Sequence, residues 1–136
     1  MKNLTKLFIC AFAIFAAFAC ADSSTPSEVV LSMYNDAQSG DYKSAASCVY
    51  ITGHDKELSK SEIAELRERV ATQMELDFKR ATERKGEITS IEIMEETIAE
   101  SGESAKVKVK LVYSKGREEI KTREAVKVKG SWLVDL

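Results

Sequence analysis

The stretch Ala-Lys-Val-Lys-Val-Lys-Leu-Val-Tyr, residues 105–113, decides the fold of this chain. Apolar side chains occupy every second position and lysines stand between them, so an extended backbone places the two kinds on opposite faces. The pattern therefore predicts a half-buried β-strand. Its buried side would carry Ala105, Val107, Val109, Leu111 and Tyr113.

Three further extended segments accompany this strand, and turn residues separate them. Residues 88–98 alternate imperfectly, which indicates a bulged strand, and the final segment 131–136 places Trp132 and Val134 on one face. In residues 120–128 the alternation assigns Ile120, Thr122, Val126 and Val128 to the buried side. The turns are expected at Ser101-Gly102, Lys115-Gly116 and Lys129-Gly130.

Before Gly86 the hydrophobic period is that of a helix, about 3.6 residues. Thr25 precedes Pro26, which is the order of a helix cap and a first helical residue, and the helix would end at Ser39-Gly40. Asp41 can cap a short second helix. A long third helix would start near Ser59 or Ser61 and end at Gly86, with an apolar stripe of Ile63, Leu66, Val70, Met74, Phe78 and Ala81.

Helices followed by consecutive antiparallel strands predict an α+β domain in which about three helices cover one face of a curved sheet of about four strands. Two motifs, Gly40-Asp41-Tyr42 and Gly130-Ser131-Trp132-Leu133-Val134, resemble those of small bacterial lipoproteins of unknown function. Those proteins belong to the nuclear transport factor 2-like superfamily, which has a cone-shaped, cystatin-like fold. The resemblance spans about residues 25–136. It implies a fold and no activity, because both motifs are structural.

The N-terminus has the layout of an export signal. Lys2 and Lys6 precede an apolar run over residues 7–19, which is shorter than the ~20 residues that a membrane-spanning helix needs. The run ends Ala17-Phe18-Ala19-Cys20, which resembles the lipobox of bacterial lipoproteins. The resemblance implies cleavage before Cys20 and acylation of its thiol. Alternatively, Ala17-Phe18-Ala19 is an ordinary cleavage site and the protein is released.

This interpretation divides the chain into a signal peptide (1–19), a lipidated tether (20–25) and one α+β domain (26–136). Cys48 would then be the domain's only cysteine and would have no partner, although a Cys20–Cys48 bridge competes if lipid is never added. The expected location is the cell envelope, with the domain in the periplasm or at the cell surface. Ala21 favours the outer membrane, because an aspartate at that place is associated with inner-membrane retention in some bacteria.

Charge and missing motifs narrow the function. The mature part has 18 basic and 22 acidic side chains once Lys2 and Lys6 are removed, and this acidic balance argues against nucleic-acid binding. No phosphate-binding glycine loop, serine nucleophile elbow, zinc-protease motif or dinucleotide fingerprint occurs. His54, the only histidine, cannot build a four-ligand zinc site with Cys48. We therefore expect no metal and no cofactor.

Asp77 is the sharpest candidate for chemistry. On a helical wheel it lies about 40° from the centre of the apolar stripe of the third helix. Some enzymes of the superfamily place an acid in the cone as a general base, and burial raises the pKa of such a group. The competing interpretation is that Asp77 pairs with a base or reaches water. The residues expected to line a cone pocket are Asp77, Arg67, Met74, Phe78 and Trp132.

A second candidate is a basic stripe on the outer face of the sheet. It would combine two neighbouring strands and consist of Lys106, Lys108, Lys110, Lys121, Arg123 and Lys127. Such a face can meet anionic lipid, a glycan or an acidic partner. The favoured interpretation is a solvated face with cross-strand partners such as Glu92 and Glu119. Its lysines would resist sheet-to-sheet dimerisation, which favours a monomer.

Three hypotheses follow. The preferred one is a non-catalytic lipoprotein, anchored in the bilayer through Cys20, whose domain binds a small ligand or an envelope partner. The second is a pocket enzyme of isomerase or dehydratase type with Asp77 as base. The third is an envelope assembly factor that docks acidic partners on the basic stripe.

Overall fold

The computed structural model describes residues 25–51 and 58–136. Three helices precede four strands, as predicted. The helices are α2 (Pro26–Gln38), α3 (Tyr42–Ser47) and α4 (Lys60–Lys85), and the strands are β1 (Ile88–Ile98), β2 (Ser104–Tyr113), β3 (Glu118–Val128) and β4 (Ser131–Asp135). None of the described helices combines the length and hydrophobicity that crossing a bilayer requires.

Side-chain caps fix where each helix begins. The Thr25 side chain accepts a hydrogen bond from the amide of Glu28, and Asp41 caps α3 in the same way. At the start of α4, Ser59 and Glu62 form a reciprocal capping box. These bonds satisfy amides that the first turn of a helix leaves without partners. The predicted helix starts are confirmed.

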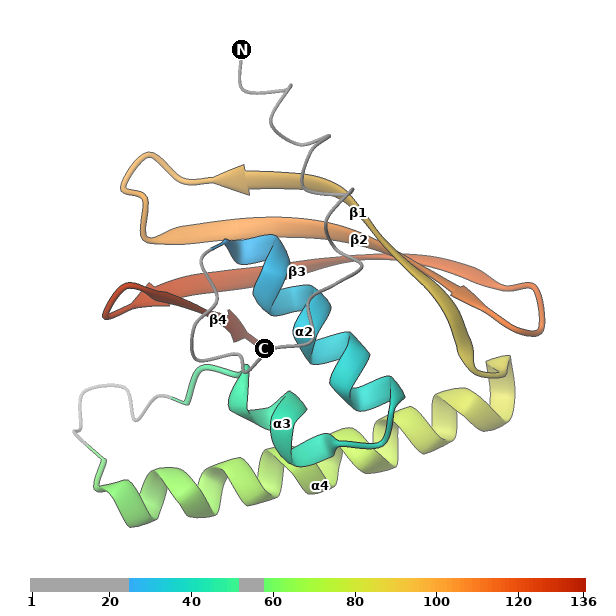
Figure 1. The fold of residues 1–136 in the computed structure, drawn as a ribbon, viewed down its shortest axis with the longest axis horizontal. Coiled ribbons are helices and arrows are strands. Elements are labelled where there is room, and N and C mark those ends of the chain that lie inside the picture. Colours follow the sequence, from blue (N-terminus) through green and yellow to red (C-terminus); the bar gives the residue numbers. More distant parts are fainter. Residues whose placement is uncertain (1–24, 52–57) are drawn as a thin grey trace.

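The four strands form an antiparallel meander in the order β1-β2-β3-β4 (Figure 1). The register shifts twice in β1, between Ile88 and Ser90 and between Ile93 and Glu95, which confirms the predicted bulges. A bulge increases the local twist of a strand, and the sheet curves around the helices. After α3 the chain returns to this sheet, where Val49 forms a parallel bridge with Val134 of β4.

α2 lies across the concave face of the sheet and supplies much of the core (Figure 1). Its residues Val29 and Val30 are fully buried, and they belong to the same cluster as Val107 and Val109 of β2. The N-terminus of α2 is also tied to the sheet, since the Ser27 amide and hydroxyl both donate to Glu96 of β1, at 3.0 and 2.5 Å. The sheet therefore orients α2 through apolar packing and through one carboxylate.

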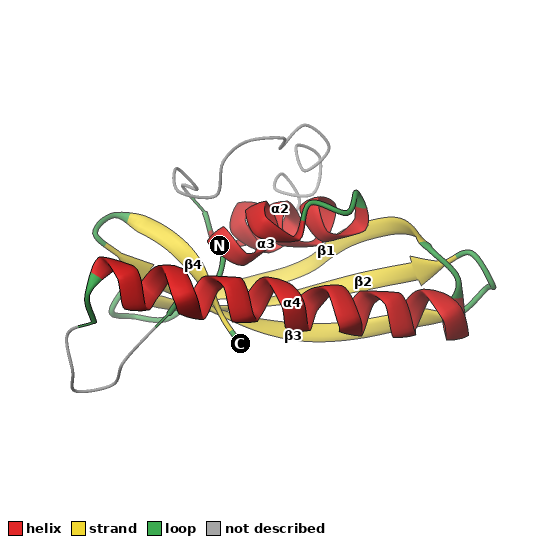
Figure 2. Cartoon of the chain, turned by 90° about the horizontal axis from the view of Figure 1, so that it is seen from below, coloured by secondary structure: helices red, strands yellow, loops and turns green. Residues whose placement is uncertain are grey.

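α4 takes a different place. It runs along the side of the molecule beside α3 (Figure 2) and packs on α3 and α2 rather than on the sheet. The Phe78 ring contacts Tyr34 of α2 and Tyr42 of α3, each with ring centroids 6.3 Å apart. Of the predicted apolar stripe only Met74 is buried, and its other members are half-buried. The C-terminal half of α4 thus stands away from the sheet and leaves space between them.

The register corrects the predicted faces of β3. Leu111, Val109 and Val107 of β2 pair with Glu119, Lys121 and Arg123 of β3, and directly opposed residues of an antiparallel pair share one face. The three charged residues therefore face inwards, whereas Ile120 is 57% exposed. The apolar residues were assigned to the inside because a buried strand face is usually apolar. Here the inner face of this part of β3 borders the space below α4.

Candidate functional site

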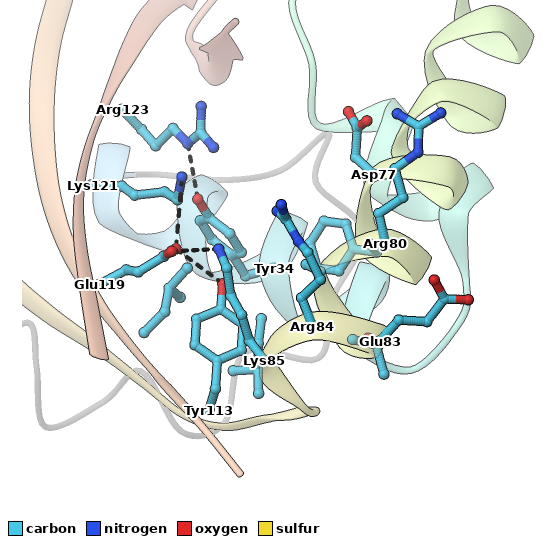
Figure 3. Close-up of a pocket in the computed structure, with 15 residues that line it drawn as sticks. Tyr34, Asp77, Arg80, Glu83, Arg84, Lys85, Tyr113, Glu119, Lys121 and Arg123 are labelled. Atoms are coloured by element: carbon cyan, nitrogen blue, oxygen red, sulfur yellow. Dashed lines mark hydrogen bonds and ion pairs between the residues drawn. The ribbon is translucent and has the colours of Figure 1, made fainter. Parts of the chain in front are cut away.

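A pocket of about 590 Å³ occupies the space between the C-terminal half of α4 and the concave face of the sheet. Tyr34 of α2 stands at its inner end, and β2 and β3 form the opposite wall (Figure 3). Volumes of ~300–1,000 Å³ are usual for small-molecule sites. The lining residues are Tyr34, Asp77, Phe78, Arg80, Ala81, Thr82, Glu83, Arg84, Lys85, Ile88, Leu111, Tyr113, Glu119, Lys121 and Arg123.

The inner part of the pocket is apolar and aromatic. Leu111 and Ile88 come from the sheet and are buried. Tyr34 and Tyr113 are each no more than 5% exposed, and Phe78 closes the α4 side. Rings held in a packed surrounding offer a rigid contact surface at little cost in conformational entropy. This floor suits the apolar part of a ligand.

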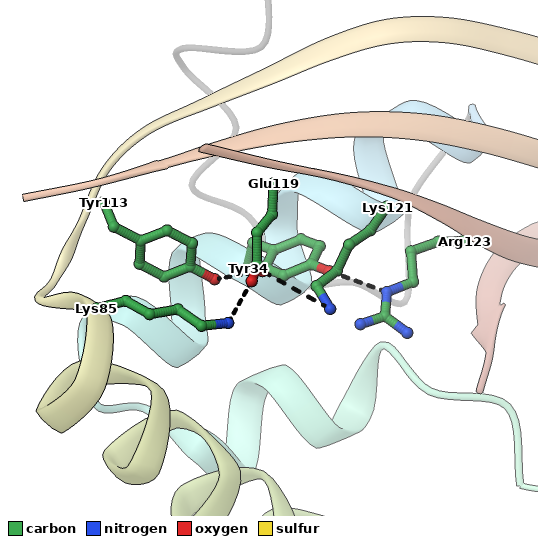
Figure 4. Close-up of polar contacts among 6 residues, drawn as sticks. All are labelled: Tyr34, Lys85, Tyr113, Glu119, Lys121 and Arg123. Atoms are coloured by element: carbon green, nitrogen blue, oxygen red, sulfur yellow. Dashed lines mark hydrogen bonds and ion pairs between the residues drawn. The ribbon is translucent and has the colours of Figure 1, made fainter. Parts of the chain in front are cut away.

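Glu119 is the centre of a polar cluster on the sheet wall (Figure 4). Its carboxylate accepts from the Lys85 ammonium and, at 3.3 Å, from the Tyr113 hydroxyl. Lys121 lies 3.8 Å from the same carboxylate. The hydrogen bond from Lys85 is the main cause that lowers the pKa of Glu119 below its ordinary value. Glu119 is consequently an anion that two cations already neutralise.

Arg123 forms the second polar contact. Its Nε donates to the Tyr34 hydroxyl at 2.9 Å, and its guanidinium carbon lies 5.8 Å from the centre of the Tyr34 ring. Burial raises the pKa of Tyr34, and burial together with Glu119 raises the pKa of Tyr113 to about 12. Both phenols therefore stay protonated near neutral pH, so Tyr34 accepts from Arg123 as a neutral hydroxyl.

The lining has an excess of positive charge. It contains five basic and three acidic side chains, whereas the whole chain has a net charge of −2. Within the described ranges, no hydrogen bond or ion pair engages the guanidinium of Arg80 or Arg84. These two arginines stand four residues apart on one side of α4, and Figure 3 shows Arg84 directed into the pocket.

Asp77 and Phe78 are the two predicted pocket residues that line the pocket. Asp77 is exposed and accepts a hydrogen bond from Gln73 Nε2 at 3.0 Å. The burial that would suit a general base is therefore not found, and the competing interpretation, in which Asp77 reaches water, describes it better. The helical wheel correctly predicted the direction of the Asp77 side chain. However, α4 stands too far from the sheet for the sheet to bury that side chain.

The other three predicted pocket residues have structural places. Met74 and Trp132 are buried in the core cluster. Arg67 donates through Nη1 to the carbonyls of Ala46 and Val49, at 2.7 and 3.1 Å. Both carbonyls lie at or just beyond the end of α3, where the Ala46 carbonyl also accepts from the Val49 amide, so Arg67 joins α4 to α3 and does not reach the pocket.

The predicted basic stripe is divided between two faces. Lys108 pairs with Glu95 at 3.7 Å and Lys110 with Glu118 at 3.5 Å, on the outer face that Lys106 shares. Lys121 and Arg123 line the pocket instead. Lys127 lies on the same side as its partner Trp132, with its ammonium 5.8 Å from the ring centre. A single six-residue basic surface was thus a wrong prediction. Lys108 and Lys110 do have carboxylate partners, as the favoured interpretation expected, but these are Glu95 and Glu118, whereas Glu119 lines the pocket.

Cys48 is buried at the end of α3 and disulfide-bonded. Its partner lies outside the described residues, as do Cys20 and His54. The expectation that Cys48 has no partner is therefore wrong. Among residues 25–51 and 58–136, no three potential metal ligands of the His, Cys, Asp or Glu type come together.

Sequence reasoning missed Tyr34, Lys85, Tyr113 and Glu119 as pocket residues. For Tyr113 and Glu119 the missing step was the register of the β2–β3 hairpin. Tyr113 donates its amide to the Arg117 carbonyl, and counting back from that turn places Leu111 opposite Glu119. The turn at Lys115-Gly116 was recognised in the sequence, so the same count was possible from the sequence alone.

A curved antiparallel meander wrapped on three helices, with an open pocket between the last helix and the sheet, is the architecture of a nuclear transport factor 2-like domain. The chain belongs to the DUF4878 family, a domain of unknown function, whose pattern matches residues 18–135. No curated protein is similar enough to match.

Solved structures are also similar to this chain, including the following two. The first is a crystal structure from Campylobacter jejuni, described as a candidate NTF2-like transpeptidase, with 26% sequence identity and a TM-score of 0.65. The match covers 83% of this chain and 99% of that one. The second is the solution structure of RPA3114, a SEC-C motif protein from Rhodopseudomonas palustris, with 13% identity, a TM-score of 0.52, and coverage of 95% and 87%. At that identity the second likeness concerns the fold alone.

Proposed function

We propose that this protein is a cell-envelope lipoprotein whose domain binds a small ligand in the pocket between α4 and the sheet. One observation carries the proposal. The stripe of α4 is apolar, yet at Phe78 and Ala81 it is only half-buried, because it borders a pocket rather than the sheet. A bound molecule would cover this half-buried surface, and burying apolar area contributes about 25 cal/mol per Å².

The transpeptidase description belongs to the Campylobacter jejuni protein. The described lining of the present pocket contains no cysteine, serine or histidine that would serve as a nucleophile or its base. Asp77 is exposed, so it lacks the burial that would raise its pKa towards that of a general base. A binding role therefore has more support than either a transfer reaction or an isomerase that uses Asp77.

The anchor is supported by the N-terminal sequence, where a basic start, a short apolar run and Cys20 follow in order. Two or three acyl chains at that cysteine would bury many methylene groups at ~0.8 kcal/mol each, which makes anchoring stable. We propose the outer membrane as the more favoured location, with the domain outside the cytoplasm as a monomer. Cys48 is disulfide-bonded, and the sequence offers only Cys10 and Cys20 as its partner. The alternative, in which Cys20 is bridged to Cys48, consumes the thiol that lipid requires.

Cell fractionation and intact mass test the anchor. The wild-type chain should be found with membranes, with the mass of residues 20–136 increased by acyl groups. Cys20→Ser should be released into the soluble envelope fraction, since Ala17-Phe18-Ala19 also suits ordinary cleavage. A soluble wild-type protein with an unmodified N-terminal cysteine, or with a Cys20–Cys48 bridge, would contradict the anchor.

Native mass spectrometry of the exported Cys20→Ser variant tests the ligand site. We expect an additional mass that disappears on denaturation. Ala81→Trp should remove it, because the indole would fill the pocket, whereas Ala64→Trp on an exposed part of the same helix should retain it. A bare mass in all three proteins would contradict ligand binding.

A further inference from the structure

We infer that the ligand of this pocket is an anionic amphiphile, namely a carboxylate or phosphate group attached to a compact apolar body. This inference rests on the proposed binding function and specifies the ligand's chemistry. It is carried by the contrast between the pocket's basic rim, formed by Arg80, Arg84 and Arg123, and its aromatic floor.

The first step concerns charge. The lining is net positive while the chain as a whole is net negative, so the excess cations are gathered at this place. A cavity with walls of low dielectric concentrates the field of one sign of charge. An anion would consequently be attracted to the pocket, and a cation would be repelled from it.

The second step concerns which cations are available. Lys85 and Lys121 are both directed at Glu119, which is their acidic partner and whose carboxylate compensates one of their two charges. Arg123 donates through Nε to Tyr34, which leaves its two terminal nitrogens to a ligand. Arg84 and Arg80 have no acidic partner within the described part of the chain. The available groups are therefore guanidinium groups.

Guanidinium groups are the side chains that best recognise planar or tetrahedral oxyanions, because their fixed fork binds two oxygens at once. Arg84 extends from α4, and Arg123 extends from β3 on the opposite wall (Figure 3). An oxyanion between these two walls would be held from both sides. The Tyr34 bond fixes the position of Arg123 beforehand, which reduces the entropy lost on binding.

The third step concerns the rest of the ligand. The apolar lining consists of Leu111, Ile88 and the rings of Tyr34, Phe78 and Tyr113, together with Ala81. An inorganic anion alone would leave the half-buried Phe78 and Ala81 uncovered, so the anionic group is expected to carry an apolar body. Such a ligand can derive from a membrane lipid, as a fatty acid or lysolipid, or from a soluble aromatic or aliphatic acid.

Calorimetry on the exported Cys20→Ser variant tests the inference with four probes: decanoate, phenylpropionate, neutral decanol and decyltrimethylammonium. The favoured acid should bind about tenfold or more tightly than decanol, and the cation should bind most weakly. Tighter binding of decanoate would indicate a lipid source, and tighter binding of phenylpropionate a soluble acid. Either outcome supports an anionic amphiphile.

Two variants locate the effect. Arg84→Gln should weaken binding of the acid about tenfold and leave decanol unchanged, because Arg84 is exposed and supports no other described group. Arg69→Gln removes the same charge from an exposed part of α4 outside the pocket and should change neither affinity.

Two failures are distinguishable. If decanol or the cation binds as tightly as the acids, or if Arg84→Gln has no effect on the acids, the anionic ligand is contradicted while the binding pocket stands. If no probe of any charge binds and native mass spectrometry finds no ligand, the proposed binding function itself fails.

Discussion

The Nε of Arg123 on β3 donates a hydrogen bond to the hydroxyl of Tyr34 on α2 at 2.9 Å, across 89 positions of sequence. The contact explains how the inner face of a sheet tolerates a charged residue opposite the fully buried Val107. The Arg123 stem can lie over the ring while its terminal nitrogens reach the open pocket. The same bond positions the proposed anion-binding group.

Tyr34→Phe tests the structural value of that bond. The variant keeps the ring and its contact with Phe78 but removes the acceptor for Arg123. We expect the free energy of unfolding to fall by about 1 kcal/mol, measured by urea denaturation. Tyr42→Phe is a matched control, since the Tyr42 ring also contacts Phe78 while its hydroxyl has no hydrogen bond within the described chain. Equal losses in both variants would show that the Arg123 contact adds nothing.

Arg67 should be a structural residue. Arg67→Met keeps the length of the side chain but removes both hydrogen bonds to the carbonyls of Ala46 and Val49. A hydrogen bond from a charged donor contributes ~1.5–3 kcal/mol, and we expect a loss of about 2 kcal/mol in chemical denaturation. Arg69→Met, on an exposed part of the same helix, should change stability by less than about 0.5 kcal/mol. A stability of Arg67→Met within that same margin would be evidence against the helix connection.

Gly86, between α4 and β1, cannot accept a side chain. Its φ of 86° and ψ of −174° lie in a region that is essentially restricted to glycine. A Cβ there would lie 2.0 Å from Ser114 Oγ and 3.1 Å from the Lys115 amide nitrogen. We expect Gly86→Ala to lower the melting temperature clearly, with a cost of about 2–3 kcal/mol. Gly116→Ala also has a positive φ but meets open space, and should cost about 1 kcal/mol. Equal melting temperatures for Gly86→Ala and Gly116→Ala would contradict this account of the turn.

The Glu119 cluster predicts a specific dependence of stability on pH. The hydrogen bond from Lys85 lowers the pKa of Glu119 in the folded state. Its contribution is therefore present above the ordinary glutamate pKa, about 4.3, and is lost as the pH falls through the folded value. We expect the difference in unfolding free energy between wild type and Glu119→Gln to be full at pH 7 and to shrink below about pH 4. Glu118→Gln, which removes the neighbouring carboxylate from the outer face, is the matched control. A difference that does not change with pH would contradict the Lys85 contact.

Much of the fold was predictable from the sequence because its signals are local. The capping residues Thr25, Asp41 and Ser59 start helices where predicted, and Gly86 ends the last one. The alternation in residues 105–113 was also sufficient for β2, since every residue on the inner face of that strand is buried.

The candidate site was less predictable because the burial of each strand or helix face depends on which other element packs against it. In β3 each of the two alternating sets mixes apolar and polar residues. The set that contains Ile120, Val126 and Val128 faces outwards. Asp77 has the right direction but remains in water, because the distance between α4 and the sheet is a tertiary property. No periodicity in the sequence encodes the distance between α4 and the sheet. That distance creates the pocket.

A titration of the isotope-labelled, exported Cys20→Ser variant with decanoate, followed by amide NMR, tests the central claim most directly. The account predicts saturable shifts at residues that line the pocket, above all Lys85, Leu111, Tyr113 and Arg123, with little change at Lys106 and Lys108 on the outer face. Shifts confined to the outer face, or no saturable shifts at all, would contradict a ligand site between α4 and the sheet.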